Sequence, residues 1–454
     1  MKQRKSQKYD FIIVGSGPAG MFAVNEILKK SPKSKIALIE RGNKIEKRSR
    51  KETMIGFGGG GTYSDGKLHY TPILSHRKAL GLISIQDYVK LVDYVDKIFI
   101  EFGVNEPYYP KNTKRVKELV EIAQKNDIKL YVRKTRHIGT DKSVKVVTKI
   151  QEHFEKMGVD IIPNTEIVDI LITRGKCIGV ISKDKKEFKG RHILIAPGRI
   201  GATWLQNLCN KYNIEYVYDK VEVGVRVEFP EAIMREYSEL MYESIFEMRT
   251  KSFDDIIRTF CPCPRGVVSI EDYKGYVCVN GHTNSKADSV NSNFAFVTEI
   301  ELNEPIENTT LYAKSIAELA TTLGGGKPII QRLADLKTGR RSTWKRINKS
   351  YVIPTLMDVT PGDIAMAMPY RIILNILEGL QKLDKVMPGI NSGSTLLYAP
   401  EVKYRGSRIQ TNTDLETEVK NLFVSGDGAG VSGNIIGAAV TGIMAASGML
   451  KNLG

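Results

Sequence analysis

Residues 9–41 constrain the fold more than any other part of this chain. The apolar run 11–14 leads directly into Gly15-Ser16-Gly17-Pro18-Ala19-Gly20, a helical pattern follows, and a second apolar run covers residues 36–39. A strand, a glycine turn, a helix and a second strand in this order are typical of a βαβ unit that binds a dinucleotide. The first glycine permits the turn, the second lets the backbone approach a pyrophosphate, and the third allows close packing of helix on strand.

An acidic residue completes this pattern. Glu40 lies twenty residues after Gly20, where a carboxylate is expected to accept hydrogen bonds from ribose hydroxyls. The helix that begins near Pro18 would present its N–H groups and its positive dipole end to the phosphates. The residues predicted to contact the dinucleotide here are Gly15, Ser16, Gly17, Pro18, Ala19, Gly20, Glu40 and Arg41.

The end of the chain distinguishes between FAD and NAD. A strand-like run at 422–425 is followed at once by Gly426 and Asp427, and an apolar helix begins at about Asn434. This arrangement resembles FAD enzymes of the glutathione-reductase type, in which the carboxylate lies against the ribityl chain and the helix N-terminus faces the flavin. A carboxylate accepts hydrogen bonds from ribityl hydroxyls, and a helix dipole stabilises negative charge on reduced flavin. FAD is therefore the predicted cofactor.

A third segment, residues 191–198, resembles the strand that crosses back toward the cofactor in the same superfamily. The resemblance adds four further segments to the predicted FAD contacts. They are Ile167, Ala196 and Gly198, then Gly426 and Asp427, and finally Asn434 and Ile435.

The glycine run 58–61 requires a close approach of the backbone to something, because consecutive glycines cost conformational entropy. By chain order this loop leaves the first βαβ unit and is expected to pass over the pyrophosphate and the isoalloxazine. Gly60, Gly61, Thr62, Ser64 and Asp65 are therefore predicted as cofactor contacts, and Lys67 as a catalytic charge near the flavin or the substrate.

The segment GFGGGGTYSDGKL at 56–68 resembles a motif of a bacterial and archaeal family of FAD-dependent dehydrogenases, also described as NAD(P)/FAD-dependent oxidoreductases. The family's His-Ile-Gly-Thr-Asp, Arg-Thr-Phe-Cys-x-Cys-Pro, Asn-Gly, Asn-Ser and Gly-x-Gly-Ala-Gly segments match at 137–141, 258–264, 280–281, 291–292 and 426–430. The chain departs at Asn434, usually glycine in the family, and at Asp427, often glutamate. The resemblance implies FAD redox chemistry without naming a substrate.

The pair Cys261 and Cys263 would point the same way from an extended segment. Three interpretations remain open, namely structural packing, a role facing flavin or substrate, and metal binding with Cys278 and His282. We list Cys261, Cys263 and His282 with Lys67 as candidate catalytic residues and predict no metal site. His137 is a further candidate acid–base group.

Composition places this chain among globular intracellular enzymes. A length of 454 residues favours two or more lobes, and five scattered cysteines do not form a disulfide framework. The basic start, MKQRKSQK, has no apolar segment behind it, so no signal peptide and a cytoplasmic location are expected. The uncharged run 431–450 is rich in small residues and predicts a buried helix rather than a membrane span.

The formal net charge of +16 favours a solvated, lysine-rich surface, with an anionic substrate as the alternative. No nucleic-acid-binding motif or interleaved aromatic pattern accompanies the charge.

The predicted fold is α/β, with a Rossmann-like FAD-binding domain of the three-layer ββα kind at 1–80, 130–221 and 396–454. A helical excursion is expected at 81–129, with helical spacing from about 84 to 125, and an inserted mixed-sheet α+β substrate or cap domain at 222–395. Further helices are expected at 144–157, 308–323 and 370–383. The segment 221–229 alternates apolar and charged residues, which predicts a half-buried strand.

The predicted function is an FAD-dependent oxidoreductase that passes a hydride or an electron pair between flavin N5 and a small organic substrate. One alternative is a C=C reductase of the geranylgeranyl-reductase sort, supplied by an external reductant. Another is a flavoprotein that binds or modifies RNA. No second strand–GxGxxG–helix unit is present, since Gly324-Gly325-Gly326 follows a helical segment and precedes Pro328, so the electron donor or acceptor stays open.

Overall fold

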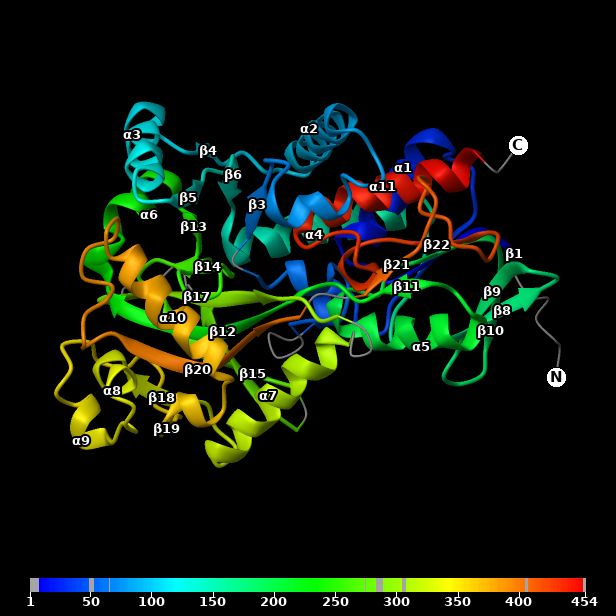
Figure 1. Cartoon of the computed structure of the whole chain (residues 1–454). Helices are drawn as coiled ribbons and strands as arrows, with labels where there is room; N and C mark the ends of the chain where they lie inside the picture. The colour runs from blue at the N-terminus through cyan, green and yellow to red at the C-terminus, as the bar shows by residue number, and fades with distance from the viewer. Residues whose placement is uncertain are drawn as a thin grey trace. The chain divides into compact units, whose positions relative to one another are not determined.

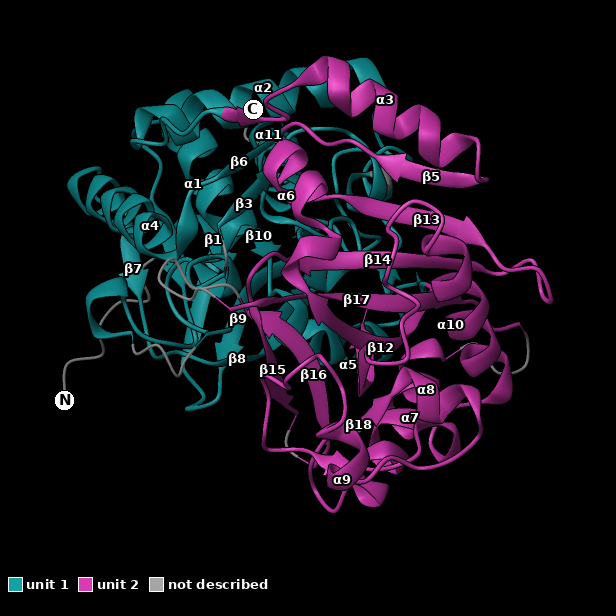
Figure 2. Cartoon of the chain, turned by 90° about the vertical axis from the view of Figure 1, so that its left-hand side faces the viewer, with its two compact units in different colours: residues 1–107, 135–219, 405–454 teal, residues 108–134, 220–404 magenta. Residues whose placement is uncertain are grey.

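The computed structural model describes residues 8–48, 53–64, 66–273, 275–282, 289–303, 308–404 and 407–451, apart from the side chain of Arg77. The chain forms two compact units, coloured separately in Figure 2. Unit 1 comprises residues 1–107, 135–219 and 405–454, and unit 2 comprises residues 108–134 and 220–404. Asp65, a predicted cofactor contact, lies outside the described residues.

Unit 1 is built on parallel strands in the order β7-β2-β1-β10-β22. These strands are β1 (Lys8–Val14), β2 (Ile36–Ile39), β7 (Asp160–Ile162), β10 (Glu187–Ile195) and β22 (Leu422–Val424). Helix α1 (Pro18–Lys30) connects β1 to β2, so the predicted βαβ unit is confirmed. The apolar runs form parallel strands because both faces of such a sheet are buried, and all four residues of β2 are buried.

An antiparallel meander extends the same sheet. Strands β8 (Ile167–Thr173) and β9 (Lys176–Ser182) form a hairpin, and β9 pairs with the first residues of β10. The last residues of β10 pair instead with β22, in the parallel direction. Strand β10 is therefore the element through which the meander joins the parallel core.

Helices of unit 1 are α2 (Ile85–Glu101), α4 (Gly139–Lys156), α5 (Ala202–Tyr212) and α11 (Ile435–Lys451). Shorter elements are η1 (Ile45–Lys47), η2 (Gly59–Gly61), β3 (Lys67–His69), η3 (Leu74–Lys78), β6 (Thr135–His137), η4 (Arg199–Gly201), β11 (Tyr216–Val217), β21 (Arg408–Ile409) and η7 (Asp427–Ala429). Helix α11 packs on α1 at Gly442, where a Cβ atom would overlap the carbonyl oxygen of Ala19. No helix among the described residues has both the length and the apolar character needed to cross a bilayer.

Unit 2 contains an eight-stranded sheet in the order β19-β18-β20-β12-β17-β14-β13-β5 (Figure 1). Its strands are β5 (Ile128–Tyr131), β12 (Val221–Pro230), β13 (Ile245–Arg249), β14 (Ile256–Cys263), β17 (Asn291–Ile300), β18 (Ile329–Arg332), β19 (Thr360–Pro361) and β20 (Leu396–Lys403). The short strand β4 (Tyr108–Tyr109) and the hairpin of β15 (Val267–Asp272) and β16 (Val277–His282) also belong to this unit.

The helices of unit 2 are α3 (Thr113–Gln124), α6 (Arg235–Met241), α7 (Thr309–Leu323), α8 (Leu333–Lys337), α9 (Trp344–Ile347) and α10 (Tyr370–Leu383). Two 3-10 turns, η5 (Glu231–Ile233) and η6 (Ile364–Met366), accompany them. Helices α7 and α10 pack over the face that carries Val223, Val225 and Val227 of β12, and their apolar residues join one core. The helices predicted at 308–323 and 370–383 are thus confirmed as α7 and α10.

One expectation about elements was met in part and another was wrong. The stretch from about 84 to 125, expected to be helical, forms two helices with a break between them, since α2 ends at Glu101 and α3 begins at Thr113. Gly103 between them adopts a φ of +104°, and two prolines follow, which the helix interior does not tolerate. Strand β12 is not half-buried, since Glu222, Arg226 and Glu228 on its polar side are also buried.

The contact-defined units differ from the predicted boundaries. The helical excursion expected at 81–129 is divided, because α2 lies in unit 1 and α3 lies in unit 2. Strand β20, expected in the cofactor domain, lies in unit 2. Strand β20 pairs with both β12 and β18, which ties it to the second sheet.

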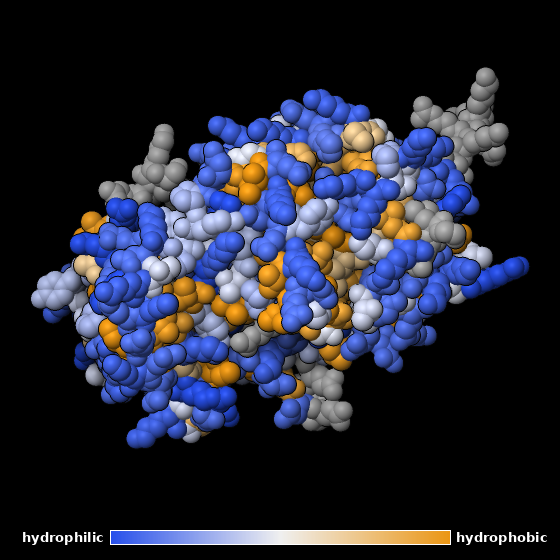
Figure 3. Space-filling model, turned by 90° about the horizontal axis from the view of Figure 1, so that it is seen from above, coloured by the Kyte–Doolittle hydropathy of each residue, from blue (hydrophilic) through white to orange (hydrophobic). Residues whose placement is uncertain are grey.

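Figure 3 shows one face of the molecule, where hydrophilic residues are widespread and hydrophobic ones are scattered among them.

Candidate functional site

The predicted cofactor residues of unit 1 gather at one edge of its parallel sheet. Gly15 follows β1, Glu40 follows β2, Ala196 follows β10 and Gly426 follows β22 at a distance of one residue. The connections on the two sides of the β1–β10 pair run in opposite directions along the sheet. Open parallel sheets bind ligands outside the carboxyl ends of their strands at such a reversal. The topology therefore brings together segments that are hundreds of residues apart in the chain.

The structure gives a different physical explanation for the presence of glycine at each of the three positions of the first turn. Gly15 adopts a φ of +98°, and a Cβ there would overlap the carbonyl oxygen of Ala196. A Cβ at Gly20 would overlap the carbonyl oxygen of Gly15. Gly17 has an ordinary φ of −70°, and a Cβ there would have no neighbour closer than 3.9 Å, to Gly59 Cα. The protein itself accounts for Gly15 and Gly20, but it leaves space beside Gly17.

The start of α1 is suited to an anion. Gly17 is the N-cap and provides no side-chain cap, and the first turn carries no acidic residue. The first N–H groups of a helix have no partner within the helix and carry the positive end of its dipole. Pro18 and Ala19 lie in this turn, and Ser16 lies before it with its hydroxyl turned to Glu40.

Glu40 is held by protein donors at both carboxylate oxygens. Oε2 accepts hydrogen bonds from the amide of Ser16 at 3.0 Å and from its hydroxyl at 2.8 Å. Oε1 accepts from the amides of Gly42 and Gly56, both at 2.9 Å. A carboxylate has about four acceptor positions, so a ribose hydroxyl would have to share with these donors. Glu40 therefore joins the first turn to the glycine loop.

The glycine loop is a packed turn. The amide of Gly58 donates to the carbonyl of Ser16 at 2.9 Å, and a Cβ at Gly59 would lie 2.9 Å from Gly17 Cα. A Cβ at Gly61 would lie 3.3 Å from the side chain of Ile435, whereas at Gly60 the nearest atom is the sulfur of Met54, at 3.1 Å. The loop thus contacts both the first turn and the start of α11.

Arg48 braces this loop from inside and was not predicted. Its Nη1 donates to the carbonyl oxygens of Phe57 at 2.6 Å and Gly59 at 3.1 Å, and to the hydroxyl of Thr62 at 3.0 Å. The guanidinium also lies over the ring of Tyr63, at 4.8 Å from its centre. The sequence around Arg48 is rich in lysine and arginine, and the net charge predicts a solvated surface of such residues, yet this arginine is buried.

The loop continues into β3, where Lys67 is located. Thr62 is fully buried, and the hydroxyl of Ser64 donates to the carbonyl of Gly61 at 2.8 Å. Lys67 is buried in β3 and lies directly opposite His137 of β6. The neighbouring pair on that side is His69 and Thr135, which share a hydrogen bond of 3.1 Å.

The C-terminal segment adds a carboxylate and a helix start. Asp427 Oδ2 accepts from Arg199 Nε at 2.9 Å, and its Oδ1 accepts from the hydroxyl of Ser432 at 2.5 Å. Gly198 precedes Arg199 with a φ of +63°, and nothing lies within 4 Å of its Cβ position. The sequence analysis did not identify Arg199, although it is adjacent to the predicted Gly198.

Asn434 caps α11. Its Oδ1 accepts from the amide of Gly437 at 2.8 Å, and its Nδ2 donates to the hydroxyl of Ser75 at 2.7 Å. This is the N-cap geometry that favours asparagine, and it gives a physical reason for the departure from the family's glycine. Ile435, the first residue of α11, packs near Gly61.

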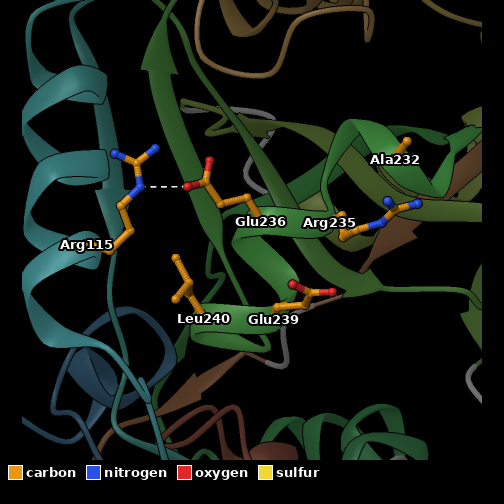
Figure 4. Close-up of a pocket in the computed structure, with 6 residues that line it drawn as sticks. All are labelled: Arg115, Ala232, Arg235, Glu236, Glu239 and Leu240. Atoms are coloured by element: carbon orange, nitrogen blue, oxygen red, sulfur yellow. Dashed lines mark hydrogen bonds and ion pairs between the residues drawn. The ribbon is translucent and has the colours of Figure 1, made fainter.

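The surface has two shallow hollows, of which one contains a predicted cofactor residue and the other does not. One, of about 550 Å³, is lined by Arg41, Asn164, Thr165, Glu166, Lys183 and Asp184 of unit 1, next to the predicted Ile167. The other, of about 420 Å³ and in unit 2, is shown in Figure 4. It contains no predicted site residue, and Arg115 Nε and Glu236 form an ion pair of 2.6 Å across it.

The candidate catalytic residues fall in both units. Lys67 belongs to unit 1, whereas Cys261, Cys263 and His282 belong to unit 2, and their catalytic roles stay predictions. Cys263 ends β14, and His282 is exposed at the end of β16. The described ranges contain no group of three or more His, Cys, Asp or Glu residues arranged to hold a metal ion.

Comparison with known proteins identifies one matching family model and one distant relative. Residues 220–404 match the family model "FAD-dependent protein, C-terminal domain-like". The same residues form the longer of the two segments of unit 2. The chain is also similar to an uncharacterized protein of Clostridium beijerinckii, with 25% identity over 97% of this chain and 80% of the relative. The family description names FAD, the cofactor predicted from the sequence.

Solved structures with a partial likeness are redox enzymes. A flavocytochrome c3 fumarate reductase in its open conformation matches with a TM-score of 0.48, 12% identity and coverage of 99% of this chain and 79% of that one. An E. coli quinol fumarate reductase matches with a TM-score of 0.45 and 11% identity, over 99% of this chain and 71% of that one. A 3-ketosteroid dehydrogenase of Rhodococcus jostii matches with a TM-score of 0.45 and 12% identity, over 97% of this chain and 96% of that one.

Proposed function

We propose that the chain is an FAD-dependent oxidoreductase and that unit 1 is a Rossmann-like FAD-binding domain of the glutathione-reductase type. The observation that carries this proposal is the space beside Gly17. Its backbone conformation is open to residues with a side chain, yet the position is a glycine, and among the described residues no atom lies closer than 3.9 Å to its Cβ position. Glycine at such a position is explained by a ligand whose phosphates approach the backbone closely.

The surrounding residues suit an FAD molecule laid across the sheet edge. The uncapped N-terminus of α1 would bind the pyrophosphate, and Glu40 would sit at the adenosine ribose. The hollow that contains Arg41 lies beside the end of β2 and would receive the adenine end. Asp427 would meet the ribityl chain with one oxygen shared with Arg199.

At the flavin end, the chain supplies a helix N-terminus and a buried cation. The first turn of α11, capped by Asn434, would stabilise negative charge near the pyrimidine ring. Lys67 would add a positive charge near the ring or the substrate. When bound, FAD supplies the exchange of a hydride or an electron pair with an organic substrate. The residues of the chain bind and orient the cofactor, and they exclude water from it.

The test is a comparison of Gly17→Val with the wild type. We expect the variant to fold, since a Cβ at this position meets no atom of the described residues closer than 3.9 Å, but to contain no FAD after purification or reconstitution. FAD is measured in the supernatant of heat-denatured protein, and folding by circular dichroism and thermal melting. Gly20→Val is the contrasting variant, because its side chain would collide with the backbone at Gly15 and prevent folding.

Stoichiometric FAD in folded Gly17→Val would disprove this phosphate site. If wild-type protein neither contains nor binds FAD, the whole functional proposal fails. Anaerobic titration of the yellow protein with NADH, NADPH and dithionite then identifies the electron donor. Bleaching by dithionite alone would indicate a partner other than a nicotinamide.

A further inference from the structure

Cys261 and Cys263 lie at an irregularity at the end of β14. The register against β17 shifts there, since Phe260 pairs with Ala295 and Cys263 with Asn293. Cys261 adopts a φ of +47°, in the left-handed region that residues with a side chain avoid. Bulges and strained residues of this kind concentrate at functional sites.

The Cys263 thiol lies against the backbone of Cys261. Cys263 is buried and its Sγ donates to the carbonyl oxygen of Cys261 at 3.6 Å, so the side chain turns back toward its neighbour. Pro262 between them fixes φ near −65°, which corresponds to about 6 Å between the flanking Cα atoms in an extended chain. Disulfide-bonded residues span about 4.4–6.8 Å between Cα atoms.

A glycine brings three reactive or polar atoms to one point. A Cβ at Gly281 of β16 would lie 2.5 Å from Asn293 Oδ1, 2.6 Å from Arg226 Nη1 and 2.6 Å from Cys263 Sγ. The Cys263 sulfur therefore lies in the same small space as the guanidinium of Arg226. A neighbouring cation favours the thiolate, which is the nucleophilic form of cysteine.

The polar groups in this space are oriented. Arg226 is fully buried; its Nε donates to Glu401 at 3.0 Å, and its Nη1 donates to Cys261 O at 3.1 Å and Asn293 Oδ1 at 3.2 Å. Because arginine only donates, this contact fixes the amide of Asn293 with its oxygen toward Arg226. The Nδ2 group of Asn293 is fully buried and has no hydrogen-bond partner among the described residues. A donor in this position is explained if an acceptor, such as a thiolate, forms beside it.

We propose that Cys261 and Cys263 form a redox-active dithiol that exchanges with organic disulfides, an activity separate from the flavin chemistry proposed above. The half-buried Cys261 attacks one sulfur of R–S–S–R, forms a mixed disulfide and releases one R–S⁻. The buried Cys263 thiolate, stabilised by Arg226 and the Asn293 amide, then attacks the Cys261 sulfur. This step forms the Cys261–Cys263 bond and releases the second R–S⁻. The dithiol loses two electrons and two protons, and the organic disulfide gains them as two thiols.

The other three cysteines serve as internal controls. Burial raises the pKa of Cys177 to about 11 and that of Cys209 to about 12. Burial also raises the pKa of Cys278, in the same unit as the dithiol. A thiol that stays protonated and buried does not react with a disulfide at neutral pH.

The experiment uses the full-length protein with its cofactor and oxidised glutathione as the probe. After reaction the protein is acid-quenched, alkylated and digested with trypsin, which cuts after Arg258 and Arg265 and yields the peptide 259–265 with both cysteines and no other. We expect this peptide to be two hydrogen masses lighter and unalkylated, with two equivalents of glutathione released per chain. Cys177, Cys209 and Cys278 should be recovered as alkylated thiols after denaturation.

Single variants separate the two steps. Cys263→Ser should stop at the mixed disulfide, with glutathione attached to Cys261 and one equivalent released. Cys261→Ser should release none in the same time, because the remaining thiol is buried. Cys278→Ser should behave as wild type. The proposal is overturned if peptide 259–265 stays reduced in excess oxidised glutathione, or if Cys263→Ser still releases two equivalents. Neither readout depends on flavin turnover, so FAD loss and dithiol inactivity are distinguishable.

Discussion

Replacing Glu40 separates a bracing role from a ribose-binding role. In the structure the carboxylate accepts four hydrogen bonds, from the amides of Gly42 and Gly56 and from the amide and hydroxyl of Ser16. Glu40→Ala removes all four and leaves three backbone donors in a buried environment. If Glu40 served only the ribose, the variant without FAD would be as stable as the wild type.

The magnitude follows from these contacts. Hydrogen bonds to a charged group contribute about 1.5–3 kcal/mol each, and a buried donor left unmade costs about 1–3 kcal/mol. The four bonds share one carboxylate and water can enter after its removal, so the effects are not additive. We expect a loss of about 3–5 kcal/mol in the free energy of unfolding, with roughly half of that for Glu40→Gln, which keeps one acceptor oxygen.

The assay is guanidinium chloride unfolding of FAD-free protein, repeated with saturating FAD. A matched control is Glu187→Ala, at the start of β10 and away from the carboxyl end of that strand, whose carboxylate forms an exposed ion pair with Lys189. Such pairs contribute about 0–1 kcal/mol. A loss below about 1 kcal/mol in FAD-free Glu40→Ala would refute the bracing role. If the difference between variant and wild type appeared only with FAD, the ribose would be the main partner.

Two further outcomes test the environment of the loop and of a buried carboxyl. Arg48→Ala should increase hydrogen exchange and proteolysis across residues 53–62 and weaken FAD binding by about 1–3 kcal/mol. Arg48→Lys should restore little, because a lysine cannot reach three acceptors in a fixed plane. Unchanged hydrogen exchange in Arg48→Ala would contradict this role. Burial raises the pKa of Glu228 above its ordinary 4.5, so the folded state favours its neutral form and loses stability as pH rises through the folded pKa. Relative to wild type, Glu228→Gln should therefore gain stability in urea unfolding as the pH rises above the ordinary glutamate pKa of 4.5. An equal pH dependence of both proteins would show that Glu228 does not titrate differently on folding.

The βαβ unit could be predicted because its signals are local. Consecutive apolar residues form β1 and β2, and the glycines between them lie next to each other in the chain. The same holds for α7 and α10, where apolar residues recur at helical spacing. The break between α2 and α3 was also encoded locally, by Gly103 and two prolines, but the helical spacing on both sides obscured it.

The bracing contacts could not be predicted, because they depend on residues brought together by the fold. Nothing near Arg48 in the sequence distinguishes it from the basic residues around it. Its hydrogen-bond acceptors, Phe57 O and Thr62 Oγ1, are nine and fourteen residues further along the chain. The burial of Glu222, Arg226 and Glu228 has a similar origin. Alternation shows that one face of β12 is polar, but not that Arg226 pairs with Glu401 or that the hydroxyl of Thr355 donates to Glu228.

The glycines of the first turn distinguish residues that the fold requires from a residue that only a ligand explains. Gly15 and Gly20 are required by the fold itself, because side chains there would collide with backbone oxygens, so they would be retained in a protein without a cofactor. Gly17 satisfies no such demand, and neither its φ nor its surroundings forbid a side chain. A residue type that the folded chain does not explain must be explained by something the chain binds. For this reason Gly17, rather than the more constrained glycines beside it, is the position at which a substitution should separate cofactor binding from folding.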